Sequence, residues 1–126
     1  MENKWKNQNF FKALKNALNG IDYTWKTQRN LKIQFLFAII AIICGLIFKL
    51  SNLEWIILII TIFLVFITEL FNTAIETVVD LYTIEYNEKA KIAKDVAAGA
   101  VLFMAVCSAF VGIILFGTKI INMLVK

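Results

Sequence analysis

Three long apolar runs, separated by short polar stretches, dominate the chain. They cover residues 31–50, 53–80 and 96–122, and each is long enough, or nearly so, for a helix to cross the roughly 30 Å hydrocarbon core of a bilayer. A β-barrel would instead need many short alternating strands with turn residues between them. The pattern therefore predicts an all-α integral membrane protein with three transmembrane helices, in a single membrane-embedded domain of residues 1–126.

Apolar residues also recur at helical spacing before the first run, over about residues 5–28. They are Phe11, Leu14, Leu18, Ile21 and Trp25, and lysines and other polar residues occupy most of the other positions. This pattern is typical of an amphipathic helix in the membrane interface, and a helix packed on the protein's own spans would have the same pattern. Gly20 weakens the predicted helix and suggests a bend or a close approach of another backbone.

The positive charges predict how the chain is oriented in the membrane. Of its thirteen Lys and Arg residues, seven lie at or before the start of the first run and three lie at residues 89–94. Because cytoplasmic loops carry an excess of positive charge, the N-terminus and the second connection are expected in the cytoplasm. The net charge of +4 then indicates contact with anionic lipid and nucleotide phosphate. No recognised nucleic-acid motif is present, so no nucleic-acid partner is expected.

Polar side chains gather on one helical face at the inner end of the second run, after fourteen residues without a charge. At 100° per residue this face holds Glu69, Asn72, Thr73, Glu76 and Asp80. Glu69 would lie about 21 Å along the helix from Trp55, the expected outer boundary, and Glu76 about 10 Å further. Two carboxylates that far apart cannot share a proton or one metal ion, so they are expected to have different roles.

Depth in the membrane suggests those roles. Glu69 would be partly desolvated, and this suits a base that takes the proton of a hydroxyl group held at lipid depth. A structural carboxyl buried between helices is the other interpretation of Glu69. Glu76 would lie at the wet edge, where it suits Mg²⁺, a cation that prefers one or two carboxylates with phosphate oxygens and water. Asp80 is expected to be a solvated carboxylate at the helix end.

A second polar cluster opens the third run in the sequence KIAKDVAAGAV, residues 91–101. Lys94 and Asp95 point about 100° apart on a helix, so each must find another partner. Lys94 suits a phosphate group, and it also suits an ordinary cation at the interface. The small residues 97–100 leave room for another helix to approach closely.

Cysteine and histidine usage excludes several chemistries. Cys44 and Cys107 both lie within apolar runs, where a free cysteine usually behaves as a small hydrophobic residue. The chain contains no histidine, which makes a zinc or haem site improbable.

The two polar clusters together resemble a known family. The pattern ExxNTAIExxVD at residues 69–80 is followed about fourteen residues later by AKDxAAGAV at residues 93–101. On a three-span chain with a basic amphipathic N-terminal helix, this combination resembles the prokaryotic diacylglycerol kinase family over residues 10–117. The sequences RNLKIQ, residues 29–34, and AAGAV resemble the undecaprenol kinase branch more than the diacylglycerol-preferring branch.

The resemblance implies an ATP-dependent lipid phosphotransferase. ATP and Mg²⁺ would form the phosphoryl donor system, and the acceptor would be undecaprenol or, as the alternative, diacylglycerol. The subunits would form a homotrimer whose active sites are shared between neighbours. These sites would lie at the cytoplasmic face of the bacterial inner membrane.

It also implies roles for individual residues. Glu69 would be the catalytic base and contact the lipid, and Glu76 and Gln28 would be metal ligands. The residues assigned to ATP are Asn16, Asn72, Glu85, Tyr86, Asn87, Lys94 and Asp95. The other lipid contacts would be Leu14 and Ala98.

The chain departs from the family pattern at two positions. The family commonly has an acidic metal ligand just before the first span, and Gln28 stands there in this sequence. A glutamine oxygen can bind Mg²⁺ but brings no charge. The residue after Tyr86 is often histidine, and here it is Asn87, which can also form hydrogen bonds.

Two other functions remain open from the sequence alone. A small proton-coupled transporter would use Glu69 as its membrane carboxylate, because intramembrane acids often mark proton paths. Such a protein would have its acid near mid-span and would not need the polar segment at residues 82–95. The second is a non-catalytic membrane protein derived from the kinases, which the glutamine at position 28 would permit.

Overall fold

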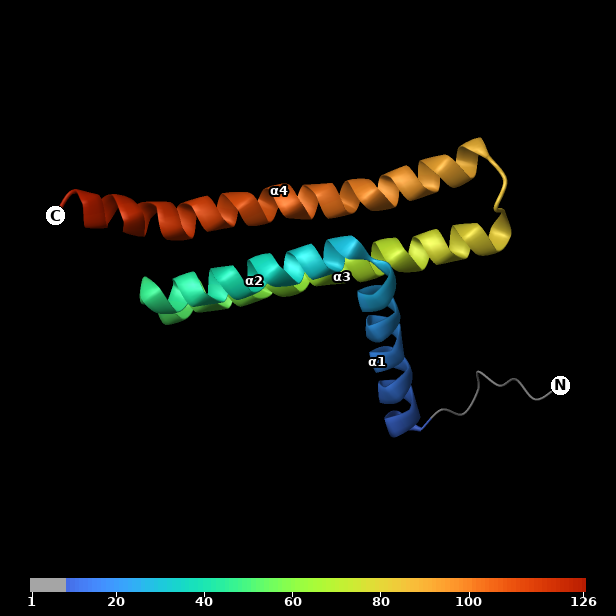
Figure 1. The fold of residues 1–126 in the computed structure, drawn as a ribbon, viewed down its shortest axis with the longest axis horizontal. Helices are drawn as coiled ribbons and strands as arrows, with labels where there is room; N and C mark the ends of the chain where they lie inside the picture. The colour runs from blue at the N-terminus through green and yellow to red at the C-terminus, as the bar shows by residue number, and fades with distance from the viewer. Residues whose placement is uncertain (1–8) are drawn as a thin grey trace.

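The computed structural model describes residues 9–126, which fold into four α-helices and contain no strand. They are α1 (Phe10–Thr27), α2 (Arg29–Ile47), α3 (Asn52–Tyr82) and α4 (Glu88–Leu124). The last three helices are long and apolar enough to cross a membrane, and they lie side by side, whereas α1 runs crosswise to them (Figure 1). The prediction of an all-α membrane protein is confirmed.

Helix α1 keeps its apolar residues uncovered. Asn9 caps the helix by accepting a hydrogen bond from the backbone N–H of Lys12 at 2.9 Å. Phe11 is 78% exposed and Leu18 is 56% exposed, so most of the apolar face does not pack on the chain's own spans. An interfacial position therefore fits this helix better than a packed one. Residues 5–8 of the predicted helix lie outside the described residues.

The predicted close approach at Gly20 is wrong for the described chain. No atom lies within 4 Å of the position that a Cβ on Gly20 would occupy, and α1 continues through this residue to Thr27. The backbone freedom of this glycine is therefore a local weakness of α1 and serves no packing contact within residues 9–126.

Helix α2 ends at Ile47, earlier than the apolar run that was expected to continue to residue 50. The reason is a helix-ending turn in which Lys49 adopts a positive φ of 52°. The N–H of Leu50 donates to Gly45 O at 3.1 Å, and the N–H of Lys49 donates to Leu46 O at 3.3 Å. This pair of bonds is the Schellman arrangement, which satisfies carbonyl groups that the helix end leaves free.

Helix α3 begins directly after that turn. The Ser51 side chain accepts from the N–H of Glu54, and the Glu54 carboxylate accepts from the N–H of Ser51 at 2.7 Å, which forms a capping box. Glu54 also forms an ion pair with Lys119 of α4 at 3.0 Å. The N-terminal end of α3 and the C-terminal part of α4 are therefore joined, with a small core of Leu50, Leu58 and Leu115 beside them.

The connection between α3 and α4 is shorter than the polar segment predicts, because both helices continue beyond their apolar runs. Helix α4 begins at Glu88, eight residues before the predicted span at 96, and Asn87 caps it by accepting from the N–H of Ala90 at 3.1 Å. Residues 83–87 alone form the loop. The end of α3 and the start of α4 thus lie on either side of this loop (Figure 1), and an ion pair between Asp80 and Lys94 joins them.

Candidate active site

Glu69 is the one large side chain in the described chain that is fully buried, with 0% of its surface exposed. Its Oε2 accepts a hydrogen bond from Gln34 Nε2 of α2 at 3.0 Å, whereas its Oε1 is buried without a partner. No ion pair within residues 9–126 involves Glu69. The site therefore holds a carboxyl group with one hydrogen-bonded oxygen and one oxygen buried without a partner.

Gln34 was missed by sequence reasoning, although a signal was present. It is the only amide side chain in the run of residues 31–50. An amide in an apolar span needs a polar partner, because leaving it unpaired in lipid is costly. The helical periodicity of α2 alone does not say which residue of α3 that partner would be.

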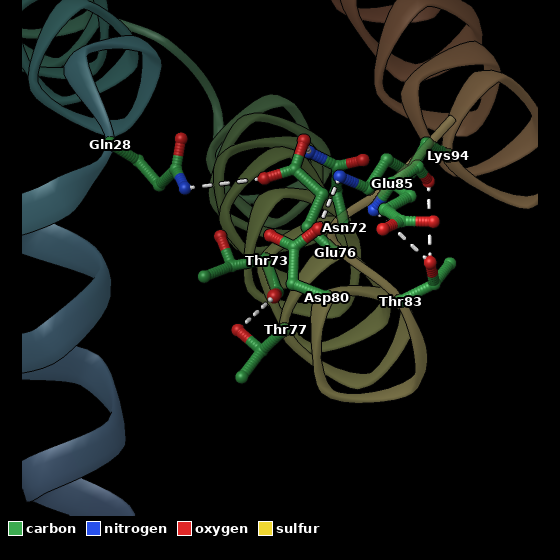
Figure 2. Close-up of polar contacts among 9 residues, drawn as sticks. All are labelled: Gln28, Asn72, Thr73, Glu76, Thr77, Asp80, Thr83, Glu85 and Lys94. Atoms are coloured by element: carbon green, nitrogen blue, oxygen red, sulfur yellow. Dashed lines mark hydrogen bonds and ion pairs between the residues drawn. The ribbon is translucent and has the colours of Figure 1, made fainter. Parts of the chain in front are cut away.

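Glu76 lies two turns further along α3 and is bonded by two amides, as Figure 2 shows. Gln28 Nε2 faces its Oε2 at 3.5 Å, and Asn72 Nδ2 donates to its Oε1 at 3.3 Å. Gln28 lies at the corner where α1 ends and α2 begins, so the bend between those helices brings it to α3. The structure thus brings together Gln28, Asn72 and Glu76, three residues that the sequence assigned to metal and nucleotide.

These three side chains offer oxygen ligands for a hard cation. Asn72 Oδ1 is buried without a partner, and rotation of the Gln28 amide would turn its oxygen towards the Glu76 carboxylate. The described residues contain no group of three His, Cys, Asp or Glu side chains that could hold a metal. One carboxylate with amide oxygens fits Mg²⁺, which keeps several waters and takes phosphate oxygens as further ligands.

Lys94 and Asp95 both have other partners, as their separation on the helix predicts. Lys94 Nζ forms an ion pair with Asp80 of α3, and Asp95 forms one with Lys91 within α4. Asp80 is exposed, as expected, but it is not simply solvated, because it is paired with Lys94. The cationic group expected to contact a phosphate thus lies beside α3, near the end that carries Glu76 (Figure 2).

The remaining assigned residues lie on exposed surfaces. Tyr86 is 82% exposed in the loop, and Glu85 is anchored there by a hydrogen bond from its N–H to Thr83 Oγ1 at 3.1 Å. The others are Asn87 at the start of α4, Leu14 and Asn16 on α1, and Ala98 on α4. Of the small residues 97–100, Ala97 is buried, as a close helix approach requires, but Ala98 is exposed and no atom lies within 4 Å of a Cβ position on Gly99.

An apolar cavity of about 510 Å³ lies between α2, α3 and α4. Its walls include Phe37 and Ala38 of α2, Leu58 and Phe66 of α3, and Ala109 of α4. Gln34 lines this cavity and also bonds Glu69. The amide thus lies between an apolar space and the buried carboxyl group.

Comparison with known proteins gives a family match over most of the chain. The sequence model described as "Prokaryotic diacylglycerol kinase" matches residues 15–116. An undecaprenol kinase of Bacillus subtilis (strain 168) is 43% identical over 111 residues, which cover 88% of this chain and 90% of that protein.

Two diacylglycerol kinases are also similar. The protein of Synechocystis sp. (strain ATCC 27184 / PCC 6803 / Kazusa) is 41% identical over 105 residues, covering 82% of this chain and 60% of that protein. The protein of Helicobacter pylori (strain J99 / ATCC 700824) is 33% identical over 101 residues, covering 80% of this chain and 79% of that protein.

Proposed function

The chain is a lipid kinase that belongs to the prokaryotic diacylglycerol kinase family, and we propose that it transfers the γ-phosphoryl group of ATP to the hydroxyl of undecaprenol. The observation that carries this proposal is Glu69, a fully buried carboxyl group with one unpartnered oxygen, on the same face of α3 as Glu76. The two acids suit the two substrates, because the lipid hydroxyl is held at membrane depth and the nucleotide is not.

Glu69 acts as the general base in this proposal. Its Oε1 accepts the proton of the lipid hydroxyl, and the hydroxyl oxygen forms a bond to the γ-phosphorus. The bond from that phosphorus to the β–γ bridging oxygen breaks, and ADP leaves with the electron pair. Phosphoryl transfer needs mainly positioning and charge stabilisation, so one base and an oriented phosphate are sufficient.

Glu76, Asn72 and Gln28 would hold Mg²⁺ together with the phosphate oxygens of ATP. The metal would supply neutralisation of the negative charge on the transferred group. Lys94 would exchange Asp80 for a phosphate oxygen, and Asp95 would contact the nucleotide. The loop residues Glu85, Tyr86 and Asn87 would border the nucleotide, with Asn16 of α1 as a further contact.

The choice of lipid is supported by similarity. The undecaprenol kinase of Bacillus subtilis matches 88% of this chain, and the sequences RNLKIQ and AAGAV resemble that branch. Diacylglycerol is the alternative acceptor, because two other relatives are diacylglycerol kinases. Leu14 and Ala98 would contact the apolar part of either lipid.

Orientation and assembly belong to the same proposal. The N-terminus and the loop of residues 83–87 would face the cytoplasm, on the inner membrane of a bacterium. A homotrimer would complete the active sites, as the family resemblance implies. Light scattering of the detergent-solubilised protein should give a protein mass three times the 14.4 kDa of one chain.

The test of this function supplies membranes containing the protein with labelled ATP and one lipid alcohol at a time. We expect Mg²⁺-dependent labelling of undecaprenol, at a higher kcat/KM than for diacylglycerol. Equal or better use of diacylglycerol would reverse the order of the two lipids. Absence of labelling with both alcohols would reject the proposed function.

A further inference from the structure

We propose that Gln34 is a positioning residue for the reaction, because it fixes the Glu69 carboxyl group so that Oε1 alone faces the lipid hydroxyl. This inference rests on the proposed function, since it concerns the orientation of the proposed base. It assigns a role to a side chain of α2, whereas every residue in the two sequence motifs lies on α3 or α4.

The hydrogen bond is the first observation. Gln34 Nε2 donates to Glu69 Oε2 at 3.0 Å, and it is the one polar partner of the carboxyl oxygens in the described part of the chain. The final torsion of a glutamate side chain is broad, so packing alone does not select one orientation of the carboxyl plane. A hydrogen-bond donor held on a neighbouring helix does select one orientation of the carboxyl plane.

The position of Gln34 is held firmly enough for this role. The next residue, Phe35, packs edge-on against Trp25 of α1 at 5.3 Å between ring centroids and stacks on Phe66 of α3 at 6.3 Å. These contacts fix the register of α2 against α3 close to Glu69. A base must be held within a fraction of an ångström of its productive geometry to be efficient.

The chemistry of an amide suits the role better than a cation would. Lys or Arg beside Glu69 would form an ion pair that stabilises the carboxylate strongly and weakens it as a base. A neutral amide donates one hydrogen bond that orients the carboxyl group and adds no opposite charge beside it. The cavity on the other side of Gln34 is lined mainly by apolar side chains, and surroundings of this kind strengthen a hydrogen bond electrostatically.

The test replaces Gln34 with methionine, which keeps the length and volume of the side chain but removes the N–H donor. We expect Gln34→Met to lower kcat for lipid phosphorylation about ten- to a hundredfold, the usual effect of losing a hydrogen bond to a charged group. The KM for ATP should be unchanged, since Gln34 lies at lipid depth. Gln34→His keeps an N–H donor of similar reach and should retain most of kcat.

Thr61→Val is the matched control. Thr61 lines the same cavity and is 8% exposed, but its hydroxyl donates to Ile57 O at 2.7 Å and does not contact Glu69. This isosteric loss of a polar group should leave kcat near the wild-type value.

Three outcomes would overturn the proposal. The first is a wild-type kcat for Gln34→Met. The second is an equal loss of kcat in the methionine and histidine variants, and the third is an equal loss of kcat in Gln34→Met and Thr61→Val.

A Glu69→Gln variant separates failure of the positioning role from failure of the proposed function. If Glu69→Gln is inactive and Gln34→Met is fully active, Glu69 remains the proposed base but Gln34 does not position it. In the Glu69→Gln background, Gln34→Met should have no further effect on residual activity.

Discussion

At the scale of single residues, the structure separates two carboxyl groups by their surroundings. Glu69 is fully buried with one hydrogen bond, whereas Glu76 is half-buried with an amide on each oxygen. Sequence reasoning found both acids and their common helical face from periodicity alone. It could not find Gln34 as a partner, because that contact joins residues 35 positions apart and depends on how α2 packs on α3.

Gln28 gives a prediction that tests the metal site. Gln28→Glu would place a second carboxylate beside Glu76, at a position where the structure has an amide 3.5 Å from that side chain. Because Mg²⁺ affinity rises with the number of charged ligands, we expect the Mg²⁺ concentration for half-maximal activity to fall about tenfold. Activity titrated with Mg²⁺ at fixed ATP measures this change.

Gln28→Met is the matched comparison for that experiment. It removes the amide oxygen and adds no charge, so it should raise the Mg²⁺ requirement. If the glutamate and methionine variants both left the Mg²⁺ dependence unchanged, position 28 would not be part of the metal site.

At the scale of helices, local chemistry sets where each element begins and ends. Asn9, Ser51 and Asn87 cap α1, α3 and α4, and each is a residue type that prefers that position. The apolar pattern predicted three spans correctly but misplaced the end of α2 and the start of α4. The pattern reports where the hydrocarbon core lies, whereas a helix can end before the apolar run does or start before it.

Gly45 gives a prediction at this scale. A Cβ at this position would lie 2.7 Å from Trp55 Cη2 and 3.0 Å from Leu50 Cδ1, so Gly45→Ala forces the indole ring to move. We expect a loss of stability of about 1–3 kcal/mol, typical of overpacking. Thermal unfolding in detergent micelles should show a lower midpoint than the wild-type protein.

Gly20→Ala is the control for this prediction. Nothing lies within 4 Å of its Cβ position in α1, so the substitution should stabilise the helix by about 0.5–1 kcal/mol. If the two substitutions changed the unfolding midpoint equally, contact between a Cβ at position 45 and Trp55 would not be the reason that this position requires glycine.

At the scale of the whole molecule, the fold brings the candidate nucleotide and metal residues together at one end of the helix bundle. The polar faces of α3 and α4 meet through Asp80 and Lys94, and the corner between α1 and α2 brings in Gln28 (Figure 2). A transporter would be expected to carry its acid near mid-span, with no second acid towards the cytoplasmic side. The family match favours the kinase, as does the presence of two acids two turns apart on α3.

Sequence reasoning reached the architecture because long apolar runs are strong signals. It assigned candidate site residues through motifs on single helices, where spacing determines which residues share a face. The contacts between helices, such as Gln34 with Glu69 and Lys94 with Asp80, came only from the structure, because helical periodicity carries no information on pairing.

The most direct test of the account is phosphoryl transfer by Glu69→Gln, measured with labelled ATP and undecaprenol in membranes. The amide keeps the size of the side chain but cannot take a proton, so the rate should fall by about a hundredfold or more while ATP binding is retained. A folded Glu69→Gln protein that phosphorylates undecaprenol at the wild-type rate would contradict the role of Glu69 as the base.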